Sequence, residues 1–522
     1  MKKKFHSDSS SGRIVTNGIF TAIQFGIYTL SGVFFIPFLV RKYGSGTYGL
    51  IALAGFLTQY IGLISRCVGN STARFLNIAL NQNDWRQANE IFNTALVANL
   101  GFMLLQLPFF ALGIWKLAWI MDFPPEITTD FRILVSCNVA VFFLSLITGV
   151  IRTPIQAANR LDISSTLEGV RLGLRIVLLL VLIRFFGAKL WLIGVVDLGL
   201  ALVFGVATFF IYRGLASDLV FRKEFISKKW IRPVANMTGW TIVMALGAGM
   251  CLKTDVWMIN RFVNSEMAGI YAALLVWPNF LKQISKQLAS VMAPVYMIDY
   301  AKGDLGRIAN LSLFSAKLLS CFAGLVVGCL GVFATPLLGL WLGDWATEHA
   351  PLFQIMTLYL AFTIGEAVLW QIFVAMNKVH YTGIVSLSMG VINIAISMTL
   401  VFLGFGAMGV AVGTVIASVL ASAIAIPLGL CRLLSISPRA VWRNHLGSLL
   451  MLLLSWASAT IAMAVGHTSV VGALGIFGVL ILSGGGLVAR VVFSKREWGY
   501  MHKLLITLLR RTGSLRQVLR GG

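Results

Sequence analysis

Positively charged side chains occur inside the apolar runs of this sequence, at positions that correspond between its two halves. Arg66 and Lys286 lie deep in such runs and are 220 positions apart, and Lys282 precedes Lys286 by one helical turn. Lys253 lies in a further run. A charge at the centre of a bilayer costs roughly 2.5–3.5 kcal/mol on insertion scales, so we expect these four cations to have a partner or a function. Their chemistry suits an anionic, phosphate-bearing ligand in a cavity. For Arg66 and Lys286 the alternative is that their long side chains extend to the lipid headgroups.

Uncharged polar side chains stand where they could complete such a site. Gln283 follows Lys282, Asn279 lies one turn before Gln283, and Gln24 lies in the first apolar run. Each amide both donates and accepts hydrogen bonds, which suits a polar headgroup and its sugars.

Acidic residues also lie inside apolar runs. Asp255 either neutralises a cation on another helix or binds a coupling ion. Glu366, in the stretch TIGEAVLWQ, is either a protonated or paired packing residue, or a site for a proton or substrate. Glu168, Arg171 and Arg175 are spaced for a local charge network on one helix, for which we expect a structural role.

The elements that carry these residues must be membrane helices. Of the 522 residues, 58% are hydrophobic and 12% are charged, and the mean hydropathy is +0.86. A run of roughly 20 apolar residues crosses the hydrocarbon core as a helix, and such runs predict about fourteen spans. We expect them at residues 14–40, 47–75, 88–118, 133–151, 167–182, 190–212, 237–260, 267–297, 311–337, 352–376, 381–402, 410–430, 446–465 and 470–489.

Lysine and arginine in the connecting segments predict the orientation, because these residues accumulate on the cytoplasmic side. They are concentrated near the N-terminus, between the sixth and seventh expected helices, and in the last part of the chain. We therefore expect a multi-pass protein of the bacterial inner (plasma) membrane with both termini cytoplasmic. The same segments account for the net charge of +23, so we expect membrane lipids, and no nucleic acid, as partners.

An internal repeat is visible when the two halves are offset by about 220 residues. The pairs that then coincide include Gly49 with Gly269, Asp84 with Asp304, and Gly187 with Gly406. An offset that spans six helices gives both halves the same orientation, which predicts a parallel repeat about an axis normal to the membrane. We expect an N-lobe at 1–212, a cytoplasmic connection at 213–236, a C-lobe at 237–430, two further helices at 431–489, and a basic, amphipathic cytoplasmic tail at 490–522.

Motifs for catalysis or metal binding are lacking from the sequence. It contains no HExxH, DxD or nucleophile-elbow pattern, and no long outer loop that would carry an active site. The six cysteines lie in or beside apolar runs without CxxC spacing, which indicates reduced packing residues. We expect no catalytic residue, no metal, no cofactor and no enzymatic activity.

Three short stretches resemble a known family: RKYGSGTYGL at 41–50, NQNDWRQAN at 81–89 and INRFVNSEMAGIYAA at 259–273. Together with the length, topology and duplication, they resemble the polysaccharide-transporter family. These are the O-antigen-type flippases of the multidrug/oligosaccharidyl-lipid/polysaccharide (MOP) exporter superfamily. The resemblance implies an all-α membrane fold with two six-helix lobes around a central cavity, followed by two C-terminal helices.

The resemblance also implies a function. It is the movement of a polyprenyl-pyrophosphate-linked oligosaccharide, of the undecaprenyl pyrophosphate type, from the cytoplasmic to the periplasmic leaflet by alternating access. Such a flippase serves the synthesis of lipopolysaccharide or exopolysaccharide, and polysaccharide polymerase machinery is an implied partner. The alternative is an ion-coupled exporter of drugs or organic cations from the same superfamily. A site for organic cations should be acidic or aromatic, whereas the predicted cations outnumber the acids here.

Overall fold

The computed structural model describes residues 10–82, 84–157, 160–216, 218–465, 470–494 and 497–498. All regular elements in these ranges are helical, which confirms the all-α prediction. Seven helices in the described ranges are long and apolar enough to cross a membrane, and up to nine if each of two bent helix pairs forms one span. Most of the expected tail, residues 499–522, lies outside the described ranges.

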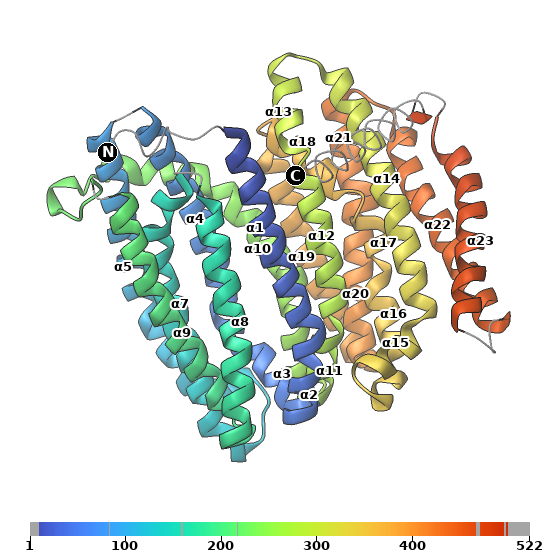
Figure 1. Ribbon diagram of the computed structural model, residues 1–522, viewed down its shortest axis with the longest axis horizontal. Coiled ribbons are helices and arrows are strands. Elements are labelled where there is room, and N and C mark those ends of the chain that lie inside the picture. The colour runs from blue at the N-terminus through green and yellow to red at the C-terminus, as the bar shows by residue number, and fades with distance from the viewer. Residues whose placement is uncertain are drawn as a thin grey trace, which may run out of the picture. The chain divides into compact units, whose positions relative to one another are not determined.

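The first compact unit, unit 1, comprises residues 1–276, 340–344 and 382–417 (Figure 1). Its helices are α1 (Ser10–Leu30), α2 (Ile36–Tyr43), α3 (Ser45–Ala54), α4 (Phe56–Asn81), α5 (Trp85–Trp115), α6 (Leu117–Ile120), α7 (Thr128–Ala157), α8 (Leu161–Phe186), α9 (Leu190–Leu215), α10 (Ile231–Phe262) and α11 (Ser265–Leu274), with most of α19 (Val379–Leu400) and of α20 (Gly406–Leu420).

The second compact unit, unit 2, comprises residues 277–339, 345–381 and 418–522. Its helices are α12 (Val276–Ser290), α13 (Ala293–Ala301), α14 (Leu305–Val332), most of α15 (Ala334–Trp341), α16 (Ala350–Leu358), α17 (Leu360–Thr363), α18 (Ala367–Ala375), the π-helical η7 (Ala421–Ala425), α21 (Ile426–Leu434), α22 (Pro438–Val465) and α23 (Val470–Val492).

Local structure repeats at the offset seen in the sequence. Asp84 and Asp304 are the N-caps of α5 and α14, and each carboxylate accepts a hydrogen bond of 2.9 Å from the backbone N–H three residues later. Gly187 and Gly406 both have positive φ, a conformation that favours glycine. The paired positions of the sequence therefore have the same local roles in the two halves.

A close helix crossing joins one of these pairs within unit 1. α3 and α11 lie side by side (Figure 1), and they touch at Gly49 and Gly269. A Cβ atom on Gly269 would lie 2.9 Å from the backbone nitrogen of Gly49, and one on Gly49 would lie 2.7 Å from the backbone nitrogen of Gly269. These atoms belong to the backbone and cannot move aside easily, so the crossing requires glycine at both positions.

A buried ion pair fastens the segment after α23 to α14 in unit 2. Nζ of Lys317 lies 2.7 Å from Oε1 of Glu497, and both side chains are largely buried. The backbone N–H of Ser494 donates to the other oxygen of Glu497 at 2.7 Å. Burial alone raises the pKa of Glu497, but the hydrogen bonds from Lys317 and Ser494 outweigh it and hold the pKa below its usual range.

We expect Glu497→Gln to lower the unfolding free energy by about 2 kcal/mol at neutral pH, because Lys317 would stay buried without its partner. A carboxylate with a lowered pKa stabilises the fold above its unfolded-state pKa and loses that contribution as the pH falls through the folded-state pKa. Thermal unfolding of parent and variant should therefore differ at neutral pH. The difference should begin to shrink below about pH 4.3, the ordinary pKa of a glutamate, and vanish once the pH is below the folded-state pKa of Glu497. Adding Lys317→Met to the variant should recover part of the loss. A difference that does not change with pH would contradict this account.

Candidate functional site

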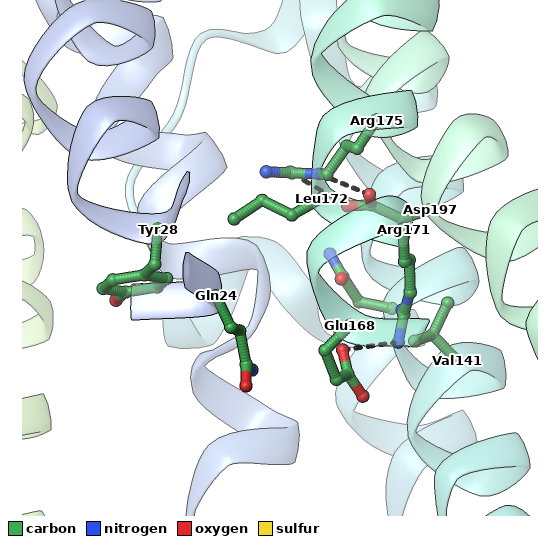
Figure 2. Close-up of a pocket in the computed structure, with 9 residues that line it drawn as sticks. Gln24, Tyr28, Val141, Glu168, Arg171, Leu172, Arg175 and Asp197 are labelled. Atoms are coloured by element: carbon green, nitrogen blue, oxygen red, sulfur yellow. Dashed lines mark hydrogen bonds and ion pairs between the residues drawn. The ribbon is translucent and has the colours of Figure 1, made fainter. Parts of the chain in front are cut away.

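Two adjoining pockets in unit 1 form a cavity among α1, α4, α7 and α8, whose lining includes several charged and polar side chains. Their volumes are about 600 and about 300 Å³, within the range of small-ligand sites, and Asn138, Val141 and Glu168 line both. Figure 2 shows the smaller pocket, in which Gln24 and Tyr28 of α1 stand across from the charged residues of α8.

Three arginines and two carboxylates line this cavity. Nη1 of Arg152 donates to Glu168 at 2.8 Å, whereas Nη1 of Arg171 lies 4.0 Å from the other oxygen of Glu168. Arg175 makes two hydrogen bonds to Asp197 of α9, one of them 3.1 Å from Nη2 to Oδ2. The set has one more positive than negative charge, and Arg171 is its most weakly paired guanidinium.

Uncharged polar side chains line the larger pocket. Thr58 and Gln59 come from α4, Asn99 from α5, and Asn138 and Ser145 from α7. Hydroxyl and amide groups both donate and accept hydrogen bonds, as the hydroxyl groups of a sugar require. The cavity can therefore bind an anion beside a hydroxylated group.

The network expected within α8 extends to two further helices. The sequence predicts that Glu168, Arg171 and Arg175 interact with one another, but Glu168 also pairs with Arg152 of α7, and Arg175 pairs with Asp197. Sequence reasoning missed that these residues share a cavity. The available signal was the presence of Arg152 and Asp197 in apolar runs on either side of α8 in the chain.

The residues predicted from the sequence for a headgroup site in unit 1 occupy different surroundings. Gln24 lines the arginine-bearing cavity. Lys253 is exposed on α10. The backbone of α4 is described at Arg66, but the side chain of this residue lies outside the described part of the structure.

The other predicted residues lie on α12 in unit 2. Nζ of Lys282 lies 4.4 Å from the ring centroid of Tyr359, a cation–π contact. Lys286, Asn279 and Gln283 are exposed. That these side chains line a cavity with Arg66 and Lys253 stays a prediction.

Asp255 is buried on α10 among oxygen-bearing side chains. Its carboxylate accepts hydrogen bonds from Thr414 at 2.8 Å, and from Tyr271 and Asn393 at 3.2 Å each. Ser397 lies one turn beyond Asn393 and donates to its amide oxygen at 3.1 Å. These contacts anchor α10 to α11, α19 and α20, and carboxylate, amide and hydroxyl oxygens are also the ligands that hard cations prefer. The surroundings of Asp255 thus suit both a structural anchor and a coupling-ion site.

Comparison with known proteins defines the class of fold. No protein-family model matches the chain. A curated relative, the "Uncharacterized membrane protein EpsK" of Bacillus subtilis (strain 168), is 26% identical over 426 residues, which are 81% of this chain and 84% of that protein. The solved structure of the lipid II flippase MurJ in an inward closed conformation matches with a TM-score of 0.67 and 14% identity, over 92% of this chain and 99% of that one.

A second solved structure has the same fold. It is the inward-facing conformation of a multidrug resistance MATE family transporter of the MOP superfamily, which matches with a TM-score of 0.64 and 15% identity, over 81% of this chain and 99% of that one. The chain therefore has the fold of MOP-superfamily transporters, as the sequence predicts. This fold is common to a lipid II flippase and a multidrug resistance transporter, so the residues of the site must distinguish between their functions.

Proposed function

We propose that this protein is a flippase that moves a polyprenyl-pyrophosphate-linked oligosaccharide from the cytoplasmic to the periplasmic leaflet, for the synthesis of cell-surface polysaccharide. The observation that carries the proposal is the cavity of unit 1, where arginines exceed carboxylates and are accompanied by amide and hydroxyl groups. Guanidinium groups bind phosphate oxygens through charge-assisted, often bidentate hydrogen bonds. The uncharged polar side chains offer hydrogen-bond donors and acceptors to the hydroxyl groups of the sugar.

The physical task of such a protein is to replace water around the headgroup. A charged, hydrated pyrophosphate cannot cross hydrocarbon unaided, because each polar group would lose its hydrogen bonds. In the proposed mechanism the headgroup enters the polar cavity while the lipid tail stays in the bilayer, and rocking of the two repeats exposes the headgroup outside. An inside-negative potential assists, since each negative charge moved outward gains roughly 2.3 kcal/mol per 100 mV.

An exporter of organic cations fits this cavity less well. Such a cargo needs a carboxylate that is open to it, whereas both carboxylates that line the cavity are paired with arginine: Glu168 with Arg152 at 2.8 Å, and Asp197 with Arg175. A cation would have to displace a guanidinium to reach either acid. The arginines also repel it.

The proposal includes the membrane location, the topology and the partners expected from the sequence. We infer that the protein lies in the bacterial inner membrane with both termini cytoplasmic, and that its lobes follow the boundaries 1–212 and 237–430. The cations Arg66, Lys253, Lys282 and Lys286 would assist the passage of the headgroup. Polysaccharide polymerase machinery would receive the exported oligosaccharide.

Native mass spectrometry of the purified protein tests the site. A polyprenyl-pyrophosphate-linked saccharide should stay bound, a cationic dye should not, and Arg171→Gln should weaken binding of the lipid. Arg184→Gln is the matched control, because Arg184 is exposed near the end of the same helix and does not line the cavity. Retention of the dye without retention of the pyrophosphate lipid would overturn the proposal.

A further inference from the structure

A buried carboxyl group lies at a break in a helix of unit 2. Glu366 is 3% exposed and stands between α17 and α18, where the flanking helical segments are bent by 43°. The break is packed tightly against its neighbours. A Cβ on Gly365 would lie 2.8 Å from the carbonyl oxygen of Ala316 on α14, and Ser285 of α12 donates to the carbonyl of Ile364 at 2.9 Å. Glu366 is the residue before α18, but its side chain does not cap that helix.

His445 of α22 faces this carboxyl group. Its Nε2 atom lies 3.3 Å from Oε1 of Glu366 and 3.3 Å from the carbonyl oxygen of Ser422, which lies in the π-helical segment η7. His445 is 7% exposed, and its ring packs against that of Phe362 at 5.9 Å between centroids. Neither oxygen of Glu366 nor Nδ1 of His445 has a hydrogen bond of good geometry. Within α-helices, π-helical turns are frequent at functional sites.

The side chain of Ser422 also lies beside the carboxyl group of Glu366. The pair has little other electrostatic support. The remaining charged residues on the helices around the break are paired elsewhere or exposed: Lys282 and Lys286 on α12, Asp299 on α13 with Arg307 on α14, Lys317 on α14, Arg432 on α21, and Arg439 and Arg443 on α22. In the described part of the chain, His445 is the basic group within 4 Å of Glu366. The ionisation of Glu366 is therefore tied to that of His445.

A buried carboxylate beside a neutral imidazole would be a negative charge without compensation, which the fold can hold only at high cost. One proton on the pair removes this charge, either by neutralising Glu366 or by making His445 its counter-ion. The two groups lie close enough to share that proton. We propose that Glu366 and His445 form a proton-binding site, which holds one proton while the helix break is packed against α22 and releases it when water enters between them.

The site has a mechanical consequence for unit 2. Release of the proton leaves a buried negative charge between the break and α22, and this charge disfavours the packed arrangement. Proton binding and packing of α22 on the broken helix therefore favour each other, as linkage requires. The inference goes beyond the proposed cargo, because it assigns a second ligand to a different unit and does not depend on what is transported.

Counting protons tests the site directly. Purified parent, Glu366→Gln and His445→Gln are each moved from slightly acidic to slightly alkaline pH, and the released protons are measured with an indicator dye. We expect Glu366→Gln to release one proton fewer than the parent, and His445→Gln to release it at more alkaline pH, because Glu366 then lacks its cation. Glu348→Gln is the matched control and should release as many as the parent. Glu348 also lies 3.3 Å from a histidine, His349, but its side chain is 75% exposed.

A measurement on the unaltered chain complements the variants in case one of them fails to fold. Difference infrared spectroscopy of the parent over the same pH range should show a change at a carboxyl group, either the loss of a carboxylic acid band or the shift of a carboxylate band, because ordinary exposed carboxyl groups do not titrate in this range. Equal proton release by the parent and both pair variants would overturn the proposal. A parent spectrum without any change in its carboxyl bands would overturn it as well.

Discussion

Arg171→Gln should slow the translocation of a polyprenyl-pyrophosphate-linked saccharide in reconstituted vesicles by roughly tenfold to a hundredfold. This range corresponds to the loss of one charge-assisted hydrogen bond, about 1.5–3 kcal/mol. Arg171 is the residue to change because its guanidinium lies 4.0 Å from Glu168 and is thus the arginine in the cavity most available to a ligand. Its removal leaves the closer pair of Arg152 with Glu168 in place.

Two further variants separate binding from folding in this experiment. Arg184→Gln, on the same helix but outside the cavity, should transport like the parent. Arg175→Gln should lower thermal stability more than Arg171→Gln does, because it leaves Asp197 without its two hydrogen bonds. Parent-like transport by Arg171→Gln would show that this cavity does not carry the headgroup.

Gly269→Ala should lower transport by about tenfold or more. The new methyl group would overlap backbone atoms of α3 at the crossing with Gly49, and overpacking of this kind costs typically 1–3 kcal/mol. Gly49 and Gly269 are corresponding positions of the two repeats. The methyl group disfavours the arrangement in which α3 and α11 touch at these two positions, and transport should fall because the protein then adopts this arrangement less readily. The loss of transport is measured in vesicles, and the loss of stability is measured by thermal unfolding in detergent.

The control for this variant is Gly101→Ala on α5, where a Cβ would meet no atom within 4 Å. It should be neutral or slightly stabilising, since alanine is a better helix former than glycine. Parent-like transport and stability of Gly269→Ala would mean that α3 and α11 do not need this close contact.

The fold could be predicted because its main determinants are local or periodic in the sequence. Apolar runs long enough to cross a bilayer identify the helices. The repeat offset correctly pairs Asp84 with Asp304 as helix caps, and Gly187 with Gly406 as positions of positive φ. These features depend on a few neighbouring residues, which the sequence displays directly.

The partners of the intramembrane charges could not be predicted in the same way. Helices that are apolar on every face give no periodic signal for their rotation, so hydropathy does not show which side chains meet. Asp197 becomes the partner of Arg175 only through the packing of α9 beside α8, and His445 reaches Glu366 only through the packing of α22 on the broken helix. The break between α17 and α18 likewise depends on contacts with other helices.

The most direct test of the proposed function is a comparison of two cargoes in the same reconstituted vesicles. A fluorescent polyprenyl-pyrophosphate-linked saccharide reports flipping through its accessibility to a membrane-impermeant quencher, and a cationic dye reports drug transport. We predict that the protein moves the saccharide lipid faster than empty vesicles do, that Arg171→Gln reduces this rate, and that the dye is not transported. Transport of the dye without flipping of the saccharide lipid would contradict the proposed function.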